Sequence, residues 1–81
     1  MFVITIDSEL NTLHPKVEVI LNKNGFEPLH SNVYINKGVA GIRAVCNTMS
    51  ELKNLEDFGK SINSIHVLQV LEWSDFTDEF K

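Results

Sequence analysis

The sequence predicts an α+β fold with its elements in the order βαββαβ, and three patterns along the chain predict it. The run Phe2–Ile6 is β-branched and aromatic and alternates between two faces, as a strand does. Apolar residues then recur at helical spacing between residues 42 and 52. Near the end, Ile62–Glu72 is rich in isoleucine, valine and leucine, which is typical of a strand.

Turn residues mark the limits of the first strand and the first helix. The strand ends at Asp7, and Pro15 suits the first turn of the helix. Asn24-Gly25 suits the end of that helix, because glycine tolerates the left-handed conformation found there. The inward residues of these two elements are predicted to be Phe2, Ile4, Ile6, Val17, Ile20 and Leu21.

A hairpin, a second helix and a last strand are predicted to follow. Phe26–Leu29 and Val33–Asn36 are joined around His30-Ser31-Asn32, which leaves room only for a hairpin. Gly59 falls in the connection before the last strand, and Ser74 is the expected N-cap of a short helical tail. The second helix is predicted to bury Ile42, Val45, Cys46, Met49 and Leu52.

This order of elements is the split βαβ plan, also called ferredoxin-like. Right-handed crossovers put strands one and three in the centre of an antiparallel four-stranded sheet, in the order four-one-three-two. Both helices then lie on one face. Because 81 residues are too few for two cores, residues 1–81 are predicted to form one domain that ends in a short tail.

Composition narrows the function classes. A net charge of −4, with Arg43 as the only arginine, argues against tight, nonspecific binding to a polyanion, although an enzyme with a local site is permitted. Cys46 is the only cysteine, so no disulfide forms within the chain and a reducing compartment is expected. No signal peptide or membrane-spanning run is visible, so we expect a cytoplasmic protein without a membrane partner.

The last strand has apolar residues on both of its faces. Ile65, Val67 and Leu71 lie on one side, and Leu68 and Val70 lie on the other. An edge strand of this kind requires a cover. Either of two covers would serve: the chain's own tail, through Trp73, Phe76 and Phe80, or a second copy in a symmetric homodimer formed sheet-to-sheet or edge-to-edge. The dimer is favoured because so small a core needs further stabilisation, and tails swapped between copies would satisfy both interpretations.

A polar site is predicted at one end of the sheet. Strand one runs antiparallel to strands three and four, so Asp7 is expected near the residues that begin them. A carboxylate, imidazoles and hydroxyl groups placed together can bind a metal or move a proton at a ribose hydroxyl. The residues expected to join Asp7 there are His30, Ser31, Asn32, Asn63, Ser64 and His66.

Each of these residues also has a structural interpretation. Asp7 can cap the following turn, and His30 and Ser31 can be ordinary turn residues. Asn63 and Ser64 can be solvated at the start of a strand, and His66 can be a packed histidine. Tyr34 is either a substrate contact or a strand aromatic with its hydroxyl at the rim. Cys46 is expected to be an inert thiol in the core.

Several local sequences resemble the virulence-associated protein D (VapD) family. Phe2–Asp7 is similar to that family's opening "YAIAFD", and Gly25-Phe26-Glu27 matches its "GFE". Asn32-Val33-Tyr34 falls where the family has "GSVY". The most specific likeness is Leu71–Thr77, which resembles the family's "E-x-[WF]-S-D-F-T" ending. The likeness covers almost the whole chain in order.

The resemblance implies a toxin-type endoribonuclease that cleaves messenger or single-stranded RNA and is often paired with an antitoxin. It further implies a homodimer of ferredoxin-like subunits, similar to the small CRISPR-associated nuclease. In that relative an aspartate matching Asp7 lies at the dimer cleft and helps to hold magnesium, which is the one candidate cofactor here. The family's serine falls on Asn32, with Ser31 one position earlier. The expected dimer residues are Leu68, Val70, Trp73 and Phe76.

This chain differs from the family before the last strand. Ser61–His66 stands where the family has "S-V-[RK]-D-I-R", so both cationic residues and the aspartate are replaced. Two hypotheses therefore stand. In the first, Asp7 acts as acid, base or metal ligand, while His66 and Ser31 or Asn32 contact the scissile phosphate. In the second, the chain is a catalytically degenerate relative that binds a nuclease, an antitoxin or another protein.

Overall fold

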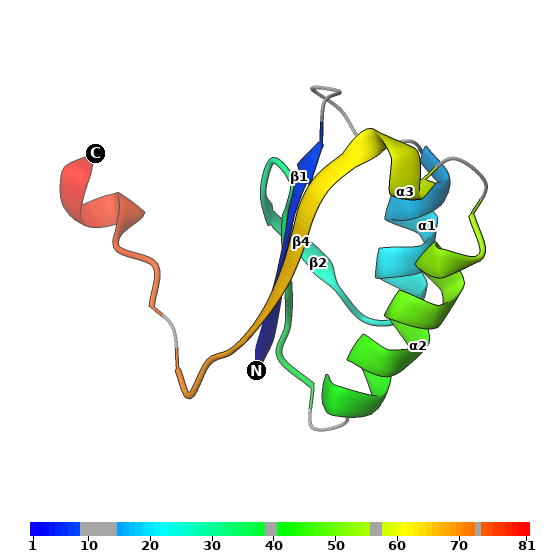
Figure 1. The fold of residues 1–81 in the computed structure, drawn as a ribbon. Helices are drawn as coiled ribbons and strands as arrows, with labels where there is room; N and C mark the ends of the chain where they lie inside the picture. Colours follow the sequence, from blue (N-terminus) through cyan, green and yellow to red (C-terminus); the bar gives the residue numbers. More distant parts are fainter. Residues whose placement is uncertain (9–14, 39–40, 56–57, 73) are drawn as a thin grey trace.

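The computed structural model describes residues 1–8, 15–38, 41–55, 58–72 and 74–81, without the side chains of residues 60 and 61. Along the chain, the strands and helices follow the predicted βαββαβ order, with a short helix added before the last strand and a 3-10 turn in the tail (Figure 1). The elements are β1 (Phe2–Ser8), α1 (Pro15–Lys23), β2 (Glu27–His30), β3 (Val33–Asn36), α2 (Gly41–Lys53), α3 (Phe58–Ser61), β4 (Ile62–Gln69) and η1 (Thr77–Phe80).

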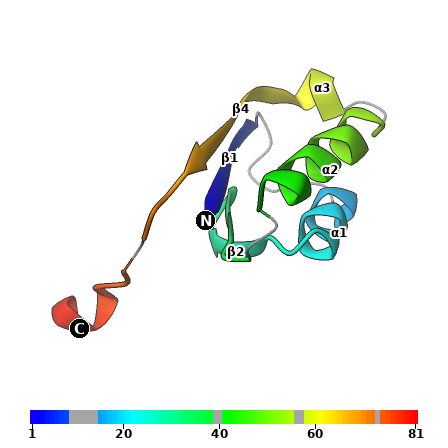
Figure 2. The same ribbon diagram turned by 90° about the horizontal axis from the view of Figure 1, so that it is seen from below.

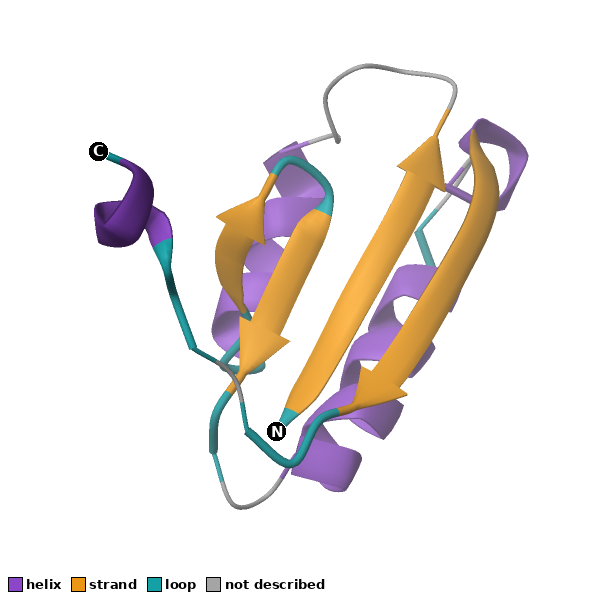
Figure 3. Cartoon of the chain, turned by 90° about the vertical axis from the view of Figure 1, so that its left-hand side faces the viewer, coloured by secondary structure: helices purple, strands orange, loops and turns teal. Residues whose placement is uncertain are grey.

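The four strands form one antiparallel sheet in the order β2-β3-β1-β4, which confirms the predicted order four-one-three-two (Figure 3). β1 is central, with Ile4 opposite Tyr34 of β3 and opposite Val67 of β4. Because directly opposed residues share a face, this register decides which side chains meet the helices and which do not.

Helices α1 and α2 lie on the same side of the sheet and leave the other face without a helix (Figure 2). We call that other side the open face. The buried cluster between the helices and the sheet holds Ile4, Ile6, Val17, Leu21, Phe26, Tyr34, Val45 and Leu52. In the described residues no helix is long and apolar enough to cross a bilayer.

The ends of α1 and α2 are set by close local contacts. Gly25 has φ +86°, the left-handed conformation expected after α1. The side chain of buried Asn36 donates to the carbonyl of Asn24 at 3.0 Å and accepts from the backbone N–H of Gly38 at 2.8 Å. Gly41 begins α2 where the ring of Phe2 leaves no room for a Cβ. The helix can therefore approach the first strand closely.

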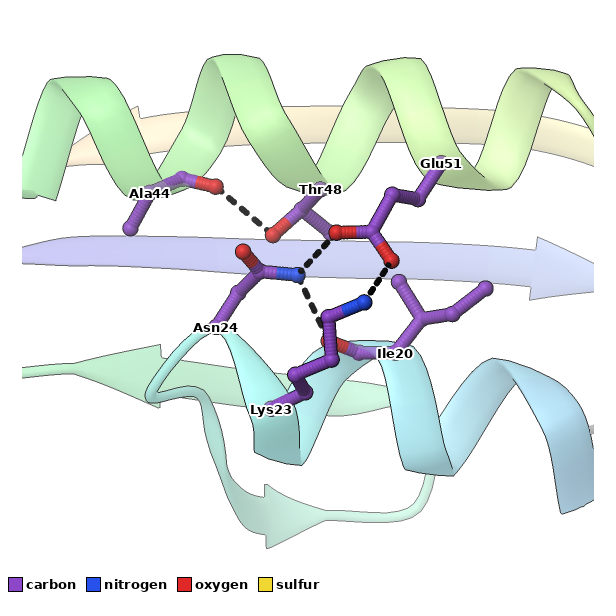
Figure 4. A network of polar contacts seen from close by, with 6 residues as sticks. All are labelled: Ile20, Lys23, Asn24, Ala44, Thr48 and Glu51. Carbon is purple, nitrogen blue, oxygen red and sulfur yellow. Dashed lines mark hydrogen bonds and ion pairs between the residues drawn. The ribbon is translucent and has the colours of Figure 1, made fainter.

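A polar network joins the end of α1 to α2 (Figure 4). Lys23 Nζ lies 2.7 Å from Glu51 Oε2, and the Asn24 amide donates to Glu51 Oε1 at 3.2 Å. These two hydrogen bonds hold the pKa of Glu51 below its usual range. Thr48 is fully buried, and its hydroxyl donates to the carbonyl of Ala44 at 2.7 Å. The network lies within the helix layer, away from the open face.

Four local predictions are wrong. Ile42 is 63% exposed and Cys46 is also exposed, so Cys46 is not a core thiol. The covered side of α2 instead holds Gly41, Val45, Thr48 and Leu52. Gly41 and Thr48 can be buried where no bulky residue would fit, because glycine has no side chain and the Thr48 hydroxyl is hydrogen-bonded within the helix. β4 ends at Gln69 rather than at residue 72. Gly59 does lie in the connection before β4, as predicted, and that connection includes α3. In the tail, Thr77 donates to Asp75, and the residue before η1 is Phe76, so Ser74 is not its N-cap.

The tail leaves the end of β4 and extends away from the sheet on the side opposite the helices (Figure 1). Leu71 is 97% exposed, Phe76 64% and Phe80 87%. The interpretation that the tail folds back over its own sheet is therefore wrong for these residues. Trp73 lies outside the described residues.

Candidate functional site

The open face is polar at one end of β1 and apolar at the other. Asp7, Thr5 and Val3 alternate with the buried residues of β1, so they lie on this face. Their partners in β4 are, in the same order, Ser64, His66 and Leu68. The sheet therefore carries a carboxylate, two hydroxyls and an imidazole at one end.

Asp7, Ser64 and His66 form the centre of the polar end. Asp7 lies directly opposite Ser64, which places their Cβ atoms about 5 Å apart, and His66 is the diagonal neighbour of Asp7 at about 7–8 Å. Both distances are within the reach of the side chains. Asp7 and His66 are exposed, and Ser64 is half-buried. These three predicted residues are thus brought together.

Thr5 was not predicted and belongs to the same group. It lies opposite His66 on β4 and opposite Val33 on β3, in the middle of the open face. Its hydroxyl is the polar group facing the imidazole across the two strands. Only the register of β1 against β4 could have identified it.

Asn63 has no direct partner on β1. The register shifts after Asp7, so that Ser8 pairs with Ile62 and Asn63 is the extra residue of a bulge. Its side chain is exposed. A bulge increases the local twist, so this irregularity contributes to how β4 presents Ser64 beside Asp7.

Of the three site residues predicted around the β2–β3 turn, Asn32 is the one that contacts β1 beside Asp7. The carbonyl of Asn32 accepts a hydrogen bond from the N–H of Ile6 at 2.9 Å, next to Asp7 in sequence. Asn32 also adopts φ 61°, a conformation that asparagine tolerates better than most residues. Its position is thus explained by the turn as well as by a role at the site.

His30 and Ser31 lie farther from Asp7. His30 is on β2, which β3 separates from β1, so about two strand spacings of 4.8 Å intervene. Its electrostatic interaction is instead with Asp75 of the tail. The pKa of Asp75 is held below its usual range by hydrogen bonds from the Thr77 hydroxyl and N–H, with a smaller contribution from His30.

Tyr34 lies on the opposite face of the sheet from Asp7. It pairs with Ile4, is 4% exposed, and faces the helix layer. Burial raises the pKa of Tyr34, and the charge of Glu18 on α1 and a hydrogen bond with that carboxylate raise it further. The structure therefore gives Tyr34 a place in the core and not among the polar residues of the open face.

The apolar end of the open face is formed by β1, β3 and β4. Val3 lies between Ile35 and Leu68 in register, and the N–H of Val70 donates to the carbonyl of Met1 at 2.8 Å, which extends the same end. Leu68 is 49% exposed, whereas Val3 is half-buried and Ile35 is 3% exposed, so the exposed part of this end lies along β4. Of the predicted dimer residues, Leu68 and Val70 adjoin this surface, and Phe76 is on the extended tail.

A metal ion held by protein ligands alone does not fit this site. Among the described residues, no group of three or more histidine, cysteine, aspartate or glutamate side chains is close enough to hold one. Among the described residues of β1, β3 and β4, Asp7 is the single carboxylate. Magnesium is commonly held by one or two carboxylates together with substrate phosphates, so one chain supplies no more than part of such a site.

No protein-family model matches the chain, and no curated protein matches it.

Proposed function

We propose that this chain is a VapD-like endoribonuclease that cleaves messenger or single-stranded RNA as a homodimer. The observation that carries the proposal is the register of β1 and β4, which puts Asp7 opposite Ser64 and beside His66 on the open face. The resemblance of residues 2–7 and 71–77 to the VapD family supports the same function. The proposal needs only a local site, which the acidic net charge of −4 permits.

Each residue of the polar end has a role in the proposed reaction. The Asp7 carboxylate accepts the proton of the ribose 2′-hydroxyl as that oxygen attacks the adjacent phosphorus and displaces the 5′-oxygen of the next nucleotide. A 2′,3′-cyclic phosphate remains, and the displaced oxygen takes a proton from water and leaves as a 5′-hydroxyl. The His66 imidazole donates a hydrogen bond to the phosphate and stabilises the charge that develops on its oxygens. Ser64 and Thr5 donate hydrogen bonds to the same group. No step is assigned to a metal.

The homodimer is supported by the surfaces that one chain leaves exposed. The apolar end of the open face and the extended tail carry Leu68, Leu71, Phe76 and Phe80, all exposed. A second copy packed on this face would bury them and would place two polar ends at one interface. Tails exchanged between the copies would give Phe76 and Phe80 a surface to cover.

Incubation of the purified chain with end-labelled RNA tests the function. Asp7→Asn is expected to slow cleavage by at least about 100-fold, which is the usual contribution of a positioned acid or base. His66→Ala is expected to slow it as well, and Asp78→Asn on the exposed tail is the control that leaves the rate unchanged. Cleavage that persists in both site variants would refute the assignment, and parallel reactions with EDTA and with magnesium report the metal requirement.

A catalytically degenerate interaction protein is the competing proposal, and one observation favours it. The described residues of β1, β3 and β4 include no lysine or arginine to hold a phosphate. If this second proposal holds, no variant cleaves RNA, and the wild-type chain forms a stable complex with a protein partner. The cleavage assay therefore separates the two functions.

A further inference from the structure

The two edges of the sheet differ in how they are protected. The outer strand β2 has four residues and carries Glu27 and Pro28, so shortness, a charge and a missing N–H all oppose further pairing. The other outer strand, β4, has eight residues and contains no proline, lysine, arginine or carboxylate. Natural edge strands that pair with nothing usually carry features that prevent pairing with another chain. The only such feature in β4 is the bulge at Asn63.

The outer side of β4 is exposed. In the part of the chain that the structure describes, β4 pairs with β1 and with no other strand. Val67 and Leu68, on opposite faces of β4, are 40% and 49% exposed. This edge therefore offers a row of backbone donors and acceptors, flanked by apolar side chains, to an incoming strand.

A cavity adjoins the same strand on the helix side of the sheet. It has a volume of about 300 Å³, and it is lined by Met49, Leu52, Lys53, Phe58, Gly59, Ile62 and Ile65. Ile65 and Val67 both face this side, since they pair with Ile6 and Ile4 of the core. A strand added to β4 would put every second side chain on this side, next to Ile65 and the cavity.

Lys53 gives the cavity its polarity. It is in the last turn of α2, and of the described residues that line the cavity it alone is charged. An apolar anchor inserted beside Ile65 would therefore be recognised best with an acidic residue near it. A second copy that paired through its own β4 would bring no carboxylate, because that strand has none.

We propose that the outer edge of β4 and the adjoining cavity bind an extended segment of a partner protein. The segment adds a strand to β4, inserts one aliphatic or aromatic side chain into the cavity, and places an aspartate or glutamate beside Lys53. Main-chain hydrogen bonds supply affinity in this mode, and the pocket and the charge supply specificity. The cavity lies on the helix side of the sheet, whereas Ser64 and His66 of the same strand lie on the open face, so the inserted anchor and the RNA would contact opposite faces of β4.

Selection from a displayed library of random twelve-residue peptides tests the proposal. Enriched peptides are expected to alternate apolar and polar residues around one bulky apolar residue, with an acidic neighbour. Synthetic copies are then titrated against the chain and its variants. Val67→Lys puts a charge on the free edge and should weaken binding about tenfold or more. Leu29→Lys, at a residue of β2 that is also 40% exposed, is the matched control and should have no effect.

Exchanging the charges of Lys53 and of the peptide tests whether the peptide binds at the cavity. Lys53→Glu should weaken binding of the selected peptide. Replacing the peptide's acidic residue with lysine should restore its binding to that variant. The proposal is overturned if no peptide is enriched, or if Val67→Lys and Leu29→Lys bind the peptides equally. It is also overturned if light scattering shows a dimer that Val67→Lys alone dissociates, since the occupant of β4 is then a second copy.

Discussion

Replacement of Gly41 by alanine should destabilise the fold, although alanine is the better helix former. A Cβ at residue 41 would lie 2.4 and 2.8 Å from two carbons of the Phe2 ring, closer than real Cβ contacts allow. Overpacking of this kind costs about 1–3 kcal/mol. Alanine recovers up to about 1 kcal/mol of helix propensity, and less at the first residue of a helix. We expect a net loss of about 1–2 kcal/mol in the free energy of unfolding.

Urea unfolding and thermal melts measure this loss. A change of about 1 kcal/mol shifts the melting temperature of a domain of this size by about 4–8 °C. Gly59→Ala is the control, because a Cβ there meets nothing within 4 Å, and it should leave stability unchanged or raise it. Adding Phe2→Ala to Gly41→Ala should remove most of the penalty in a double-mutant cycle. If Gly41→Ala matches Gly59→Ala, the close approach of α2 to β1 is wrong.

Three further predictions concern single residues. Asn32→Gly should leave stability unchanged while Asn32→Ala costs about 1 kcal/mol, because φ is 61° there; equal losses in urea melts would contradict the turn geometry. Tyr34 is the only tyrosine, so absorbance at 295 nm should show it ionising above its ordinary pKa of about 10, with a smaller rise in Glu18→Gln. Because the pKa of Tyr34 is raised in the folded state, the stability that it adds is present below the unfolded pKa. That stability is lost as pH rises through the folded pKa. Glu51 has a lowered pKa, so the stability it adds is present above its unfolded pKa and is lost as pH falls through the folded pKa. In urea titrations at acidic pH, Glu51→Gln should therefore reduce the dependence of stability on pH. An unchanged dependence would exclude the contact with Lys23.

The fold was predictable because short-range patterns agreed along the chain. Alternation in Phe2–Ile6 located the buried face of β1, and Gly25 marked the end of α1. The covered side of α2 was not predictable from hydrophobicity alone. Gly41 and Thr48 are buried there because of a close approach to Phe2 and a hydrogen bond to Ala44, while apolar Ile42 faces solvent.

The polar site was predictable only in part. Antiparallel topology was enough to place Asp7 near Ser64 and His66. It was not enough to find Thr5, which requires the register, or to exclude His30, which is one strand too far away. The position of the tail also differed from the prediction that it covers its own sheet, for a related reason. A single chain's sequence does not state whether its exposed aromatic residues, such as Phe76, cover its own sheet or another surface.

The location of RNA on the protein tests the central proposal most directly. An RNA oligonucleotide with 2′-O-methyl groups cannot supply the attacking hydroxyl, so it forms a stable complex that NMR can map on the ¹⁵N-labelled chain. We expect the largest amide shifts at Thr5, Asp7, Ser64 and His66, and much smaller shifts in His66→Ala at equal RNA concentration. Shifts confined to α1 and α2, or no shifts at all, would contradict the proposal that the polar end of the open face acts on RNA.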